Sequence, residues 1–305
     1  MKQKFTKFTI IVFLIISFVS GSIYCQEDSI GLNKKRLKTV VIGAGALYVT
    51  SMAGLYQLWY KDYPQSSFHF FNDNNEWLQM DKVGHFTTAY YLSNSGYETL
   101  RYCGLGSNKS MWYASGASFL FLTTIEVFDG FSEEWGASSM DFIVNTAGII
   151  LFSAQQYHWK EQKIKMKFSF HQTTNSDYRP DLLGDNFIEN VIKDYNGQSY
   201  WLSANIKSFI PKHSQIPEWL NIAFGYSAKG MIGAIDNYSE DLPADISDIT
   251  RCRQYFMSFD IDLSKIKTNS QLMRMILKAA NFIKIPFPAL EYNIEDGFMF
   301  HTFYF

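Results

Sequence analysis

The chain has few cysteines and little net charge. Its 305 residues include three cysteines, Cys25, Cys103 and Cys252, and they show no CxxC or zinc-type spacing. Cysteines so far apart do not predict a disulfide framework. The formal net charge is −2, and the chain has no basic cluster or stacking motif. These absences argue against a disulfide scaffold, a zinc-finger module and a nucleic-acid partner.

The chain also lacks the short motifs of common enzymes. It has no GxSxG nucleophile elbow and no HExxH pair. The segment Gly43-Ala44-Gly45 lies in an apolar run and follows no strand, so it is not a dinucleotide fingerprint. Ser93 and Ser95 lie near His85, but serine in such helices is usually a packing residue. The motifs therefore neither indicate nor exclude an enzyme.

Aromatic residues and an export signal are what the chain does contain. Aromatic side chains make up 17% of the residues, which suits a membrane interface, a β-rich domain or both. Residues 1–25 predict a secretory signal peptide, with a basic start, an apolar run and a cleavage zone ending near Cys25. Two alternatives stay open, a lipid-modified Cys25 and an uncleaved signal anchor. Each interpretation places the protein in the cell envelope.

Residues 34–158 predict a helical, membrane-associated domain. The run from Thr39 to Trp59 carries no charge and is long enough to cross a bilayer, so we expect it to contact lipid as a transmembrane helix. The other expected helices are Asp81 to Cys103, Ser110 to Ile125 and Phe142 to Trp159. Together they predict a bundle of about four apolar helices, partly embedded in the membrane.

Residues 163–305 change from a helical period to the alternation of β-strands. This predicts an antiparallel β-rich domain with two short helices, Asp181 to Asp194 and Ser270 to Lys284. Strands are expected near Ile164–Phe170, Tyr200–Lys207, Leu220–Ser227, Tyr255–Leu263, Ala289–Asn293 and Phe298–Phe305. The fold class is therefore α+β, a helical bundle followed by an antiparallel sheet or partial barrel.

Different sequence observations favour a sheet and a partial barrel. A terminal aromatic residue on an alternating strand, here Phe305, is typical of outer-membrane barrels. Six strands, however, fall short of the usual minimum of about eight for a closed barrel. An antiparallel sheet with one buried face explains the same alternation. Both alternatives remain open from the sequence.

A polar cluster interrupts the apolar helices between residues 81 and 145. Its members lie three or four residues apart in pairs, so each pair shares one face of a helix. Charged groups in apolar surroundings need partners, or they serve chemistry. The candidate residues are Asp81, Lys82, His85, Ser93, Glu126, Asp129, Ser132, Asp141 and Asn145.

Two interpretations of the cluster stay open. In the first, a divalent metal ion binds to an imidazole and several carboxylates, with Asp81, His85, Glu126, Asp129 and Asp141 as candidate ligands. In the second, the same residues hold the fold together. Asp81 would then cap one helix, and Ser138, Ser139 and Asp141 would be the candidate caps of another. Lys82 would neutralise Glu126 or Asp129, and Asn145 would bond across helices.

The two runs DKVGHFTTAYYLSNSGY and IEVFDGFSEEWGASSMDFIVNTAGI carry a family resemblance. They resemble the YfiM-like family of predicted periplasmic lipoproteins of unknown function over residues 77–155. More distantly, the Asp-Lys-x-x-His segment is similar to VanZ-type membrane proteins. The resemblance implies an exported envelope protein with packed helices, and it implies no reaction. The residues that carry it are Asp81, Lys82, Gly84, His85, Tyr90, Ser93, Glu126, Asp129, Gly130, Ser132, Asp141, Asn145 and Gly148.

These observations predict an exported cell-envelope protein with a structural or accessory role. We expect it to be associated with a membrane and to contact lipid or another envelope component. The alternative is a metal-assisted hydrolase or transferase that acts on an envelope lipid or lipid-linked substrate. A third interpretation is a component that docks an envelope protein partner on its aromatic sheet. The sequence leaves open which membrane, inner or outer, the protein contacts.

Overall fold

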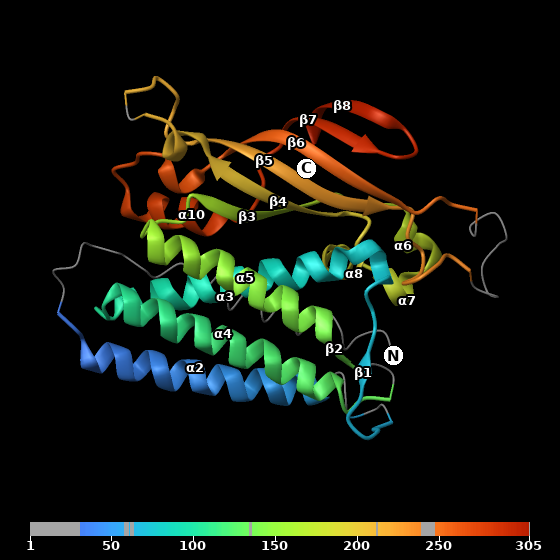
Figure 1. Cartoon of the computed structure of the whole chain (residues 1–305), viewed down its shortest axis with the longest axis horizontal. Helices are drawn as coiled ribbons and strands as arrows, with labels where there is room; N and C mark the ends of the chain where they lie inside the picture. The colour runs from blue at the N-terminus through green and yellow to red at the C-terminus, as the bar shows by residue number, and fades with distance from the viewer. Residues whose placement is uncertain are drawn as a thin grey trace. The chain divides into compact units, whose positions relative to one another are not determined.

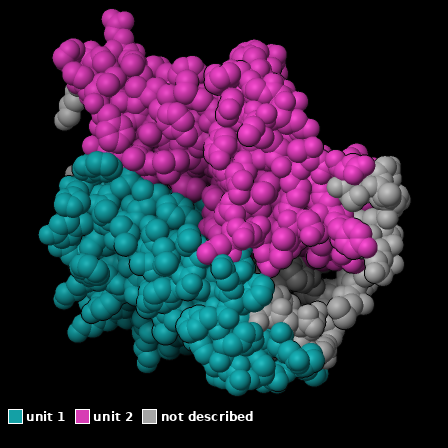
Figure 2. Space-filling view, turned by 45° about the vertical axis from the view of Figure 1, so that its right-hand side comes forward, with its two compact units in different colours: residues 1–73, 85–162 teal, residues 74–84, 163–305 magenta. Residues whose placement is uncertain are grey.

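The computed structural model describes residues 31–57, 61, 64–133, 136–211, 213–238 and 248–304. The expected signal peptide with Cys25, and the expected ends at Trp59 and Phe305, lie outside the described residues. The chain divides into two compact units (Figure 2). The first contains residues 1–73 and 85–162, and the second contains residues 74–84 and 163–305. Each is described by itself.

The first unit is built on four long helices (Figure 1). They are α2 (Lys34–Leu55), α3 (Met80–Tyr102), α4 (Ser107–Asp129) and α5 (Ser139–His158). The first turn of α3 clusters with the second unit. Two short parallel strands, β1 (Phe70–Phe71) and β2 (Ala137–Ser138), pair beside the ends of the helices. The four helices expected from the sequence are present with shifted ends.

Helix α2 packs against α4. Met52 and Leu55 form a small core with Phe121, Ile125 and Phe128, and the hydroxyls of Tyr48 and Thr124 lie 2.8 Å apart. Among the described helices, α2 is the one that is long and apolar enough to cross a membrane, by length and composition. The expectation of about four apolar helices is therefore wrong in this respect. The other three helices are interrupted by serine, glycine and ionisable residues.

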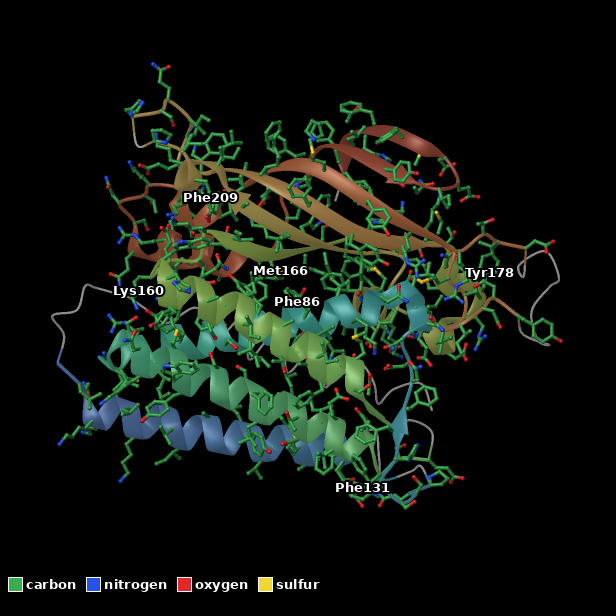
Figure 3. The ribbon with its side chains drawn as sticks, viewed as in Figure 1. Phe86, Phe131, Lys160, Met166, Tyr178 and Phe209 are labelled. Carbon is green, nitrogen blue, oxygen red and sulfur yellow. The ribbon has the colours of Figure 1, made fainter. Side chains whose placement is uncertain are left out.

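A glycine brings α3 and α5 into close contact. A Cβ atom on Gly148 of α5 would lie 2.2 Å from the carbonyl oxygen of Phe86 and 3.0 Å from the Cβ of Ala89, both on α3 (Phe86 is labelled in Figure 3). Real side chains do not tolerate such a contact with backbone. Gly148 therefore allows the two helix backbones to approach each other one to two turns from the polar cluster.

The segment between α2 and α3, which the sequence analysis left outside its expected helices, contains short elements of its own. Among its described residues it contains β1 and the 3₁₀ helix η2 (Glu76–Gln79), whose Trp77 and Leu78 have positive φ angles. The physical reason is local, because residues 72–75 read Asn-Asp-Asn-Asn and these side chains favour turns over helix interiors.

The second unit contains a six-stranded antiparallel sheet (Figure 1). Strands adjacent in the chain are adjacent in the sheet, in the order β3 to β8, so the topology is a meander. The strands are β3 (Ile164–Phe170), β4 (Gln198–Asn205), β5 (Leu220–Lys229), β6 (Cys252–Ile261), β7 (Phe287–Asn293) and β8 (Gly297–Tyr304). The six strands expected from the alternation are present.

Short helices connect these strands. The helix expected over Asp181–Asp194 is two helices, because Gly184 between them has φ 99°, a left-handed conformation that ends the first. The helix expected over Ser270–Lys284 ends earlier, at Ala280. The connecting helices are α6 (Asn175–Tyr178), α7 (Pro180–Leu183), α8 (Phe187–Lys193), α10 (Gln271–Ala280) and the 3₁₀ helices η3 (Ile206–Phe209) and η4 (Leu263–Lys265).

The sheet is strongly curled. Tyr304 of β8 lies beside β4, four strands away, where its hydroxyl is 3.4 Å from that of Ser199 and its ring is 6.0 Å from that of Trp201. Strands so far apart meet only when the sheet bends over on itself. The strand order still has two ends, β3 and β8, so the described strands form a partial barrel that does not close.

The buried face of this sheet is the polar one. Trp201 and Phe256 lie inside with many polar side chains, whereas Leu202 and Phe224 point outward and are exposed. This is the reverse of an antiparallel sheet with an apolar buried face. The polar residues on the inside include Lys167, Ser199, Ser203, Asn205, Asn221, Ser227, Gln254, Ser258, Asp260, Glu291 and Asn293.

Candidate functional site

The polar cluster of the first unit centres on His85. His85 lies in the second turn of α3, and Asp141 and Asn145 lie one turn apart on α5. The two ring nitrogens face different partners, because Nδ1 lies 3.3 Å from the Asn145 Oδ1 atom and Nε2 lies 4.0 Å from the Asp141 Oδ2 atom. The structure therefore brings Asp141 and Asn145 of α5 to the two ring nitrogens of His85 on α3.

Glu126 approaches His85 from the last turn of α4. Its Oε1 atom lies 4.0 Å from His85 Nδ1, and its Oε2 atom accepts a hydrogen bond of 3.3 Å from the backbone N–H of Ser138. Glu126 therefore lies on the Asn145 side of the imidazole, away from Asp141's contact with Nε2. Helix α4 thus supplies one side chain, and α5 two, to the surroundings of a histidine on α3.

Ser138 holds the start of α5 in place. Its hydroxyl accepts a hydrogen bond of 3.1 Å from the backbone N–H of Asp141 and donates one of 2.7 Å to the carboxylate of Asp73. The first bond is an N-cap, as predicted. The second ties the helix start to the residues that follow β1. Together they fix the direction in which the Asp141 side chain leaves the helix.

Burial and charge act on Glu126 together. Burial, together with the neighbouring carboxylates of Asp141 and Asp129, raises the pKa of Glu126 to about 8. His85 and the Ser138 N–H oppose this rise. Glu126 therefore keeps its proton at neutral pH in the folded protein. A carboxyl group with such a pKa can give or take a proton near physiological pH.

Asp81 and Lys82 occupy the first turn of α3. Asp81 lies inside the helix and does not cap it. It precedes His85 by one turn on the same helix face, and a carboxylate oxygen lies within 4.8 Å of a ring nitrogen of His85. Its other contacts are the hydroxyl of Tyr195 at 3.0 Å and the ammonium group of Lys82 at 3.2 Å.

The remaining candidates have different environments. The hydroxyl of Ser93 donates to the carbonyl of Ala89, 3.0 Å away on the same helix, which is a packing role. Ser132 is buried, and its backbone forms an isolated β-bridge with Gln65. Asp129, at the end of α4, acts on Glu126 through its charge. The structure therefore gathers His85 with residues of α4 and α5 and leaves Ser93 outside the cluster.

Sequence reasoning missed two residues that shape the cluster. Asp73 bonds Ser138, and Tyr195 bonds Asp81. Asp73 belongs to the turn-forming run at residues 72–75, a signal that pointed to a turn but not to a partner. Tyr195 lies far along the chain, and no local pattern connects it with Asp81.

A second polar cluster, also missed, lies inside the curled sheet. The ammonium group of Lys167 lies 2.8 Å from the carboxylate of Asp260, which also accepts a 2.6 Å hydrogen bond from Ser203. Both partners of the ion pair are fully buried. Nearby, Lys165 pairs with Asp262 at 2.8 Å. His301 pairs with Glu291 at 2.6 Å in the same way.

Burial and ion pairing act in opposite directions on the pKa values of Asp262 and Lys167 inside the sheet. Burial alone would raise the pKa of Asp262, but the ammonium group and hydrogen bonds of Lys165 outweigh it and hold the pKa below its usual range. Burial lowers the pKa of Lys167, and Asp260 opposes that fall. Burial likewise lowers the pKa of Lys284 to about 8. The interior is thus a network of direct pairs.

Comparison with known families gives one match. Residues 69–156 match a family described as "Predicted periplasmic lipoprotein (DUF2279)". The match covers all of α3 and α4 and most of α5, with all of the cluster around His85. It supports the expected resemblance to predicted periplasmic lipoproteins, and it does not confirm the YfiM name or the VanZ similarity. The family description supports an exported, envelope-associated protein and names no reaction. No curated protein and no solved structure matches the chain.

Proposed function

We propose that this chain is a membrane-associated accessory protein of the cell envelope, and that the outer face of its sheet lies against lipid. One observation carries the proposal, the reversed polarity of the curled sheet. An apolar row crosses five neighbouring strands in register, from Leu202 through Phe224, Met257 and Leu290 to Phe300. Each of these side chains is exposed, Phe224 to 52% and Phe300 to 70%.

A second row runs beside the first and is aromatic along its whole length. It consists of Tyr200, Tyr226, Tyr255, Tyr292 and Phe298, which are cross-strand neighbours on β4 to β8. Tyrosine combines an apolar ring with a polar hydroxyl, and for that reason it is enriched where hydrocarbon meets water. In this row Tyr255, Tyr292 and Phe298 are exposed, whereas Tyr200 and Tyr226 are partly buried against the cluster of Met80, Ala228 and Met231. Exposed aromatic residues next to an aliphatic and phenylalanine row are the arrangement that a membrane interface favours.

Water and lipid select opposite faces of an antiparallel sheet. In water, the apolar face is buried and the polar face is solvated. A sheet with lysine, aspartate and asparagine inside and phenylalanine, leucine and methionine outside is typical of proteins in a bilayer. A soluble protein rarely exposes a contiguous apolar patch of this size without a partner. The hydrocarbon chains of lipid would solvate this apolar face.

The height of the apolar band limits how deeply the sheet enters. On β6 the outward residues from Tyr255 to Phe259 cover four residue steps, or about 14 Å at about 3.4 Å per residue. The apolar band of spanning barrels is about 25 Å tall. The band therefore fits one leaflet. We infer that the sheet lies in the interface and does not cross the membrane.

Two helices support membrane association independently of the sheet. Helix α2 is long and apolar enough to span a bilayer by length and composition. Helix α10 exposes Leu272, Met273 and Ile276 beside the exposed basic residues Arg274 and Lys278. A helix with this composition lies at the surface of anionic lipid, where the basic residues attract phosphate groups.

The test measures the depth of individual side chains in the full chain reconstituted in vesicles. A nitroxide label at Phe224→Cys should be accessible to oxygen, which concentrates in lipid, and shielded from a water-soluble nickel complex. The matched control is a label at Ile235→Cys, an apolar residue of the same unit that is 65% exposed outside the strands. That label should show the opposite accessibility. The native cysteines Cys103 and Cys252 are buried, so they compete little for the label.

Two results would overturn the proposal. If the label at Phe224 is as accessible to the nickel complex as the label at Ile235, the sheet faces water. If it is immobilised and shielded from both reagents, a protein partner covers the face and not lipid. Because the label reports one position, the result does not depend on whether α2 holds the chain in the membrane.

A further inference from the structure

We propose that the outer edge of β8 pairs with β8 of a second copy of this chain, so that two sheets join into one across a two-fold axis. The partner strand runs antiparallel and binds the backbone groups that β8 turns away from β7. This inference deepens the proposed function, because it names what lies beside the sheet, and it rests on that function for the surroundings of the edge.

Strand β8 lies at one end of the strand order and pairs with β7 on one side (Figure 1). In an antiparallel ladder, alternate residues direct their N–H and C=O groups to opposite sides, so about half of these groups on an end strand face away from the sheet. Apart from the ladder with β7, no backbone hydrogen bond joins residues 297–304 to another described part of the chain. The outward groups are therefore available to another strand.

The opposite end of the sheet is already covered. Phe168 of β3 forms an isolated parallel bridge with Ile283. Its N–H donates to the carbonyl of Phe282, and its carbonyl accepts from the N–H of Lys284, both at 2.8 Å. A head-to-tail series of copies, with β8 of one beside β3 of the next, would have to displace this segment. An isologous contact, in which both copies use β8, needs no such change.

Strand β8 also lacks the residues that protect the edges of natural sheets. Its sequence, GFMFHTFY, contains no lysine, arginine, aspartate, glutamate or proline. Phe298, Phe300 and Phe303 are each at least 70% exposed. The register with β7 is regular from Gly297 to His301, and its one shift lies beyond these residues. A regular, uncharged and aromatic edge is a template for pairing with another strand.

Lipid makes an open edge more costly than water does. Water binds the N–H and C=O groups of an exposed strand, whereas hydrocarbon cannot, and open sheet edges do not occur where a protein faces the hydrocarbon of a membrane. Phe298 and Phe300, on the outward face of β8, belong to the two rows that we place against lipid. The backbone between them therefore needs a strand as its partner.

A second copy of β8 meets the requirements of this edge. Two antiparallel strands related by a two-fold axis normal to the sheet keep the same face outward in both copies. Phe298 and Phe300 of the two copies then form aromatic cross-strand contacts, and the apolar rows continue from one sheet into the other. Met299 and His301 remain on the inner face. Among the described strands, β8 is the one end strand that lacks a partner on its outer side, so each copy supplies what the other needs.

The experiment measures distances between copies by pulsed electron spin resonance, on the full chain in vesicles with a large excess of lipid. Single nitroxide labels are placed at Phe300→Cys, Leu290→Cys and Met257→Cys, which are cross-strand neighbours on β8, β7 and β6. Neighbouring strands lie about 4.8 Å apart, so each step away from the two-fold axis should lengthen the distance between the two labels by up to about 10 Å. The label at Phe300 should give the shortest distance, and Leu290 is its matched control one strand further in.

Two results would overturn the pairing. The first is no coupling at Phe300 beyond that of randomly distributed chains, which is also expected if another part of the same chain, or a different protein, covers the edge. The second is an equal distance at all three positions, which indicates a head-to-tail contact. If the chain labelled at Phe300 fails to fold, labels at Phe298→Cys and Tyr292→Cys repeat the comparison on the neighbouring row.

The accessibility of the label at Phe224, measured in the same vesicles, separates this inference from the proposed function. A lipid-facing Phe224 without coupling at Phe300 contradicts the pairing alone. Coupling at Phe300 with a water-facing Phe224 contradicts the placement in lipid alone.

Discussion

The helical unit and the sheet unit bury polar groups in different ways. In the sheet, Asp260, Asp262 and Glu291 each lie within 3 Å of a lysine or histidine nitrogen. In the helical unit, the charges that act on Glu126 are one histidine and two carboxylates. A network of direct pairs stabilises a fold in one charge state. Glu126, whose burial and carboxylate neighbours raise its pKa to about 8, is instead suited to take up or release a proton near neutral pH.

Each of the two units exposes apolar side chains of its own. On the helices, Leu120, Ile143 and Ile150 are each more than half exposed, while the hydroxyls of Ser115 and Ser153 lie 2.8 Å apart between α4 and α5. On the sheet, the same contrast separates Phe224 from Ser203. The comparison therefore concerns how the buried polar groups are compensated, since both units contain them.

The largest effect should come from breaking a pair inside the sheet. Lys167→Met leaves the Asp260 carboxylate buried without its cation, which we expect to lower the free energy of unfolding by roughly 3–5 kcal/mol. Denaturant unfolding of the full chain in detergent measures it. The control is Lys267→Met, which breaks an exposed pair with Glu218 and should cost less than about 1 kcal/mol. Equal effects would show that the buried pair is not structural.

Glu126→Gln should change the pH dependence of stability in the metal-free protein. The folded state raises the pKa of Glu126 from 4.5 to about 8, so between these values the folded protein keeps a proton that the unfolded chain has lost. The free energy of unfolding therefore falls as pH rises from about 4.5 to about 8, by roughly 2–4 kcal/mol, and is flat above.

Glutamine has the shape of a protonated glutamate and does not titrate. The variant should lose this slope and be more stable than the wild type at pH 9. Thermal unfolding at pH 5, 7 and 9, with a chelator present, measures the difference. An unchanged slope in Glu126→Gln would mean that another group titrates, and the contrast between the two units would lose its main electrostatic support.

Gly148→Ala tests the close approach of α3 and α5. The added methyl group would meet the carbonyl oxygen of Phe86, so the helices must separate, at a cost of about 1–3 kcal/mol. Gly116→Ala is the control, because Gly116 lies in α4 with open space around its Cβ position. That change should stabilise the protein by up to about 1 kcal/mol. Thermal unfolding of both variants should thus shift in opposite directions, and a shift in the same direction would contradict the packing.

The smallest effect should come from Ser138→Ala. It removes the cap of α5 and the bond to Asp73, so we expect a loss of about 1 kcal/mol in the helical unit. Ser270→Ala removes the cap of the exposed helix α10 in the sheet unit, where the bond to the Met273 N–H is longer at 3.3 Å. Hydrogen exchange of each helix reports the two losses separately. A larger loss of protection in α10 than in α5 would reverse the expected order.

Local periodicity was enough to predict the elements of the fold. The change from helical to alternating patterns predicted four long helices and six strands, and Ser138 was recognised as a cap. Residues 64–79 lie outside the four expected helices, and the sequence did not predict the strand β1 or the 3₁₀ helix η2 found there. Such errors arise where short polar side chains decide the backbone.

The burial of each face could not be predicted from the sequence in the same way. Alternation shows that Trp201 and Leu202 lie on opposite faces of β4, but it does not show which face meets solvent. Which face is buried depends on whether water or lipid surrounds the sheet, and on the curl that brings Tyr304 to β4. For the site, i and i+4 spacing predicted that Asp141 and Asn145 share a face. The position of Glu126 near Nδ1 of His85 depends on how a third helix packs, and residue spacing in the sequence does not predict this packing.

The contact between Tyr304 and β4 also has a consequence for the order of folding. A meander forms from consecutive hairpins, so β3 to β7 can pair one after another as the chain is made. The side chain that covers Trp201 comes from β8, the last strand to appear. Until β8 pairs, water still reaches the lysine and aspartate side chains of the interior. The six-stranded unit should therefore become protected from hydrogen exchange in one late step, after its hairpins have formed.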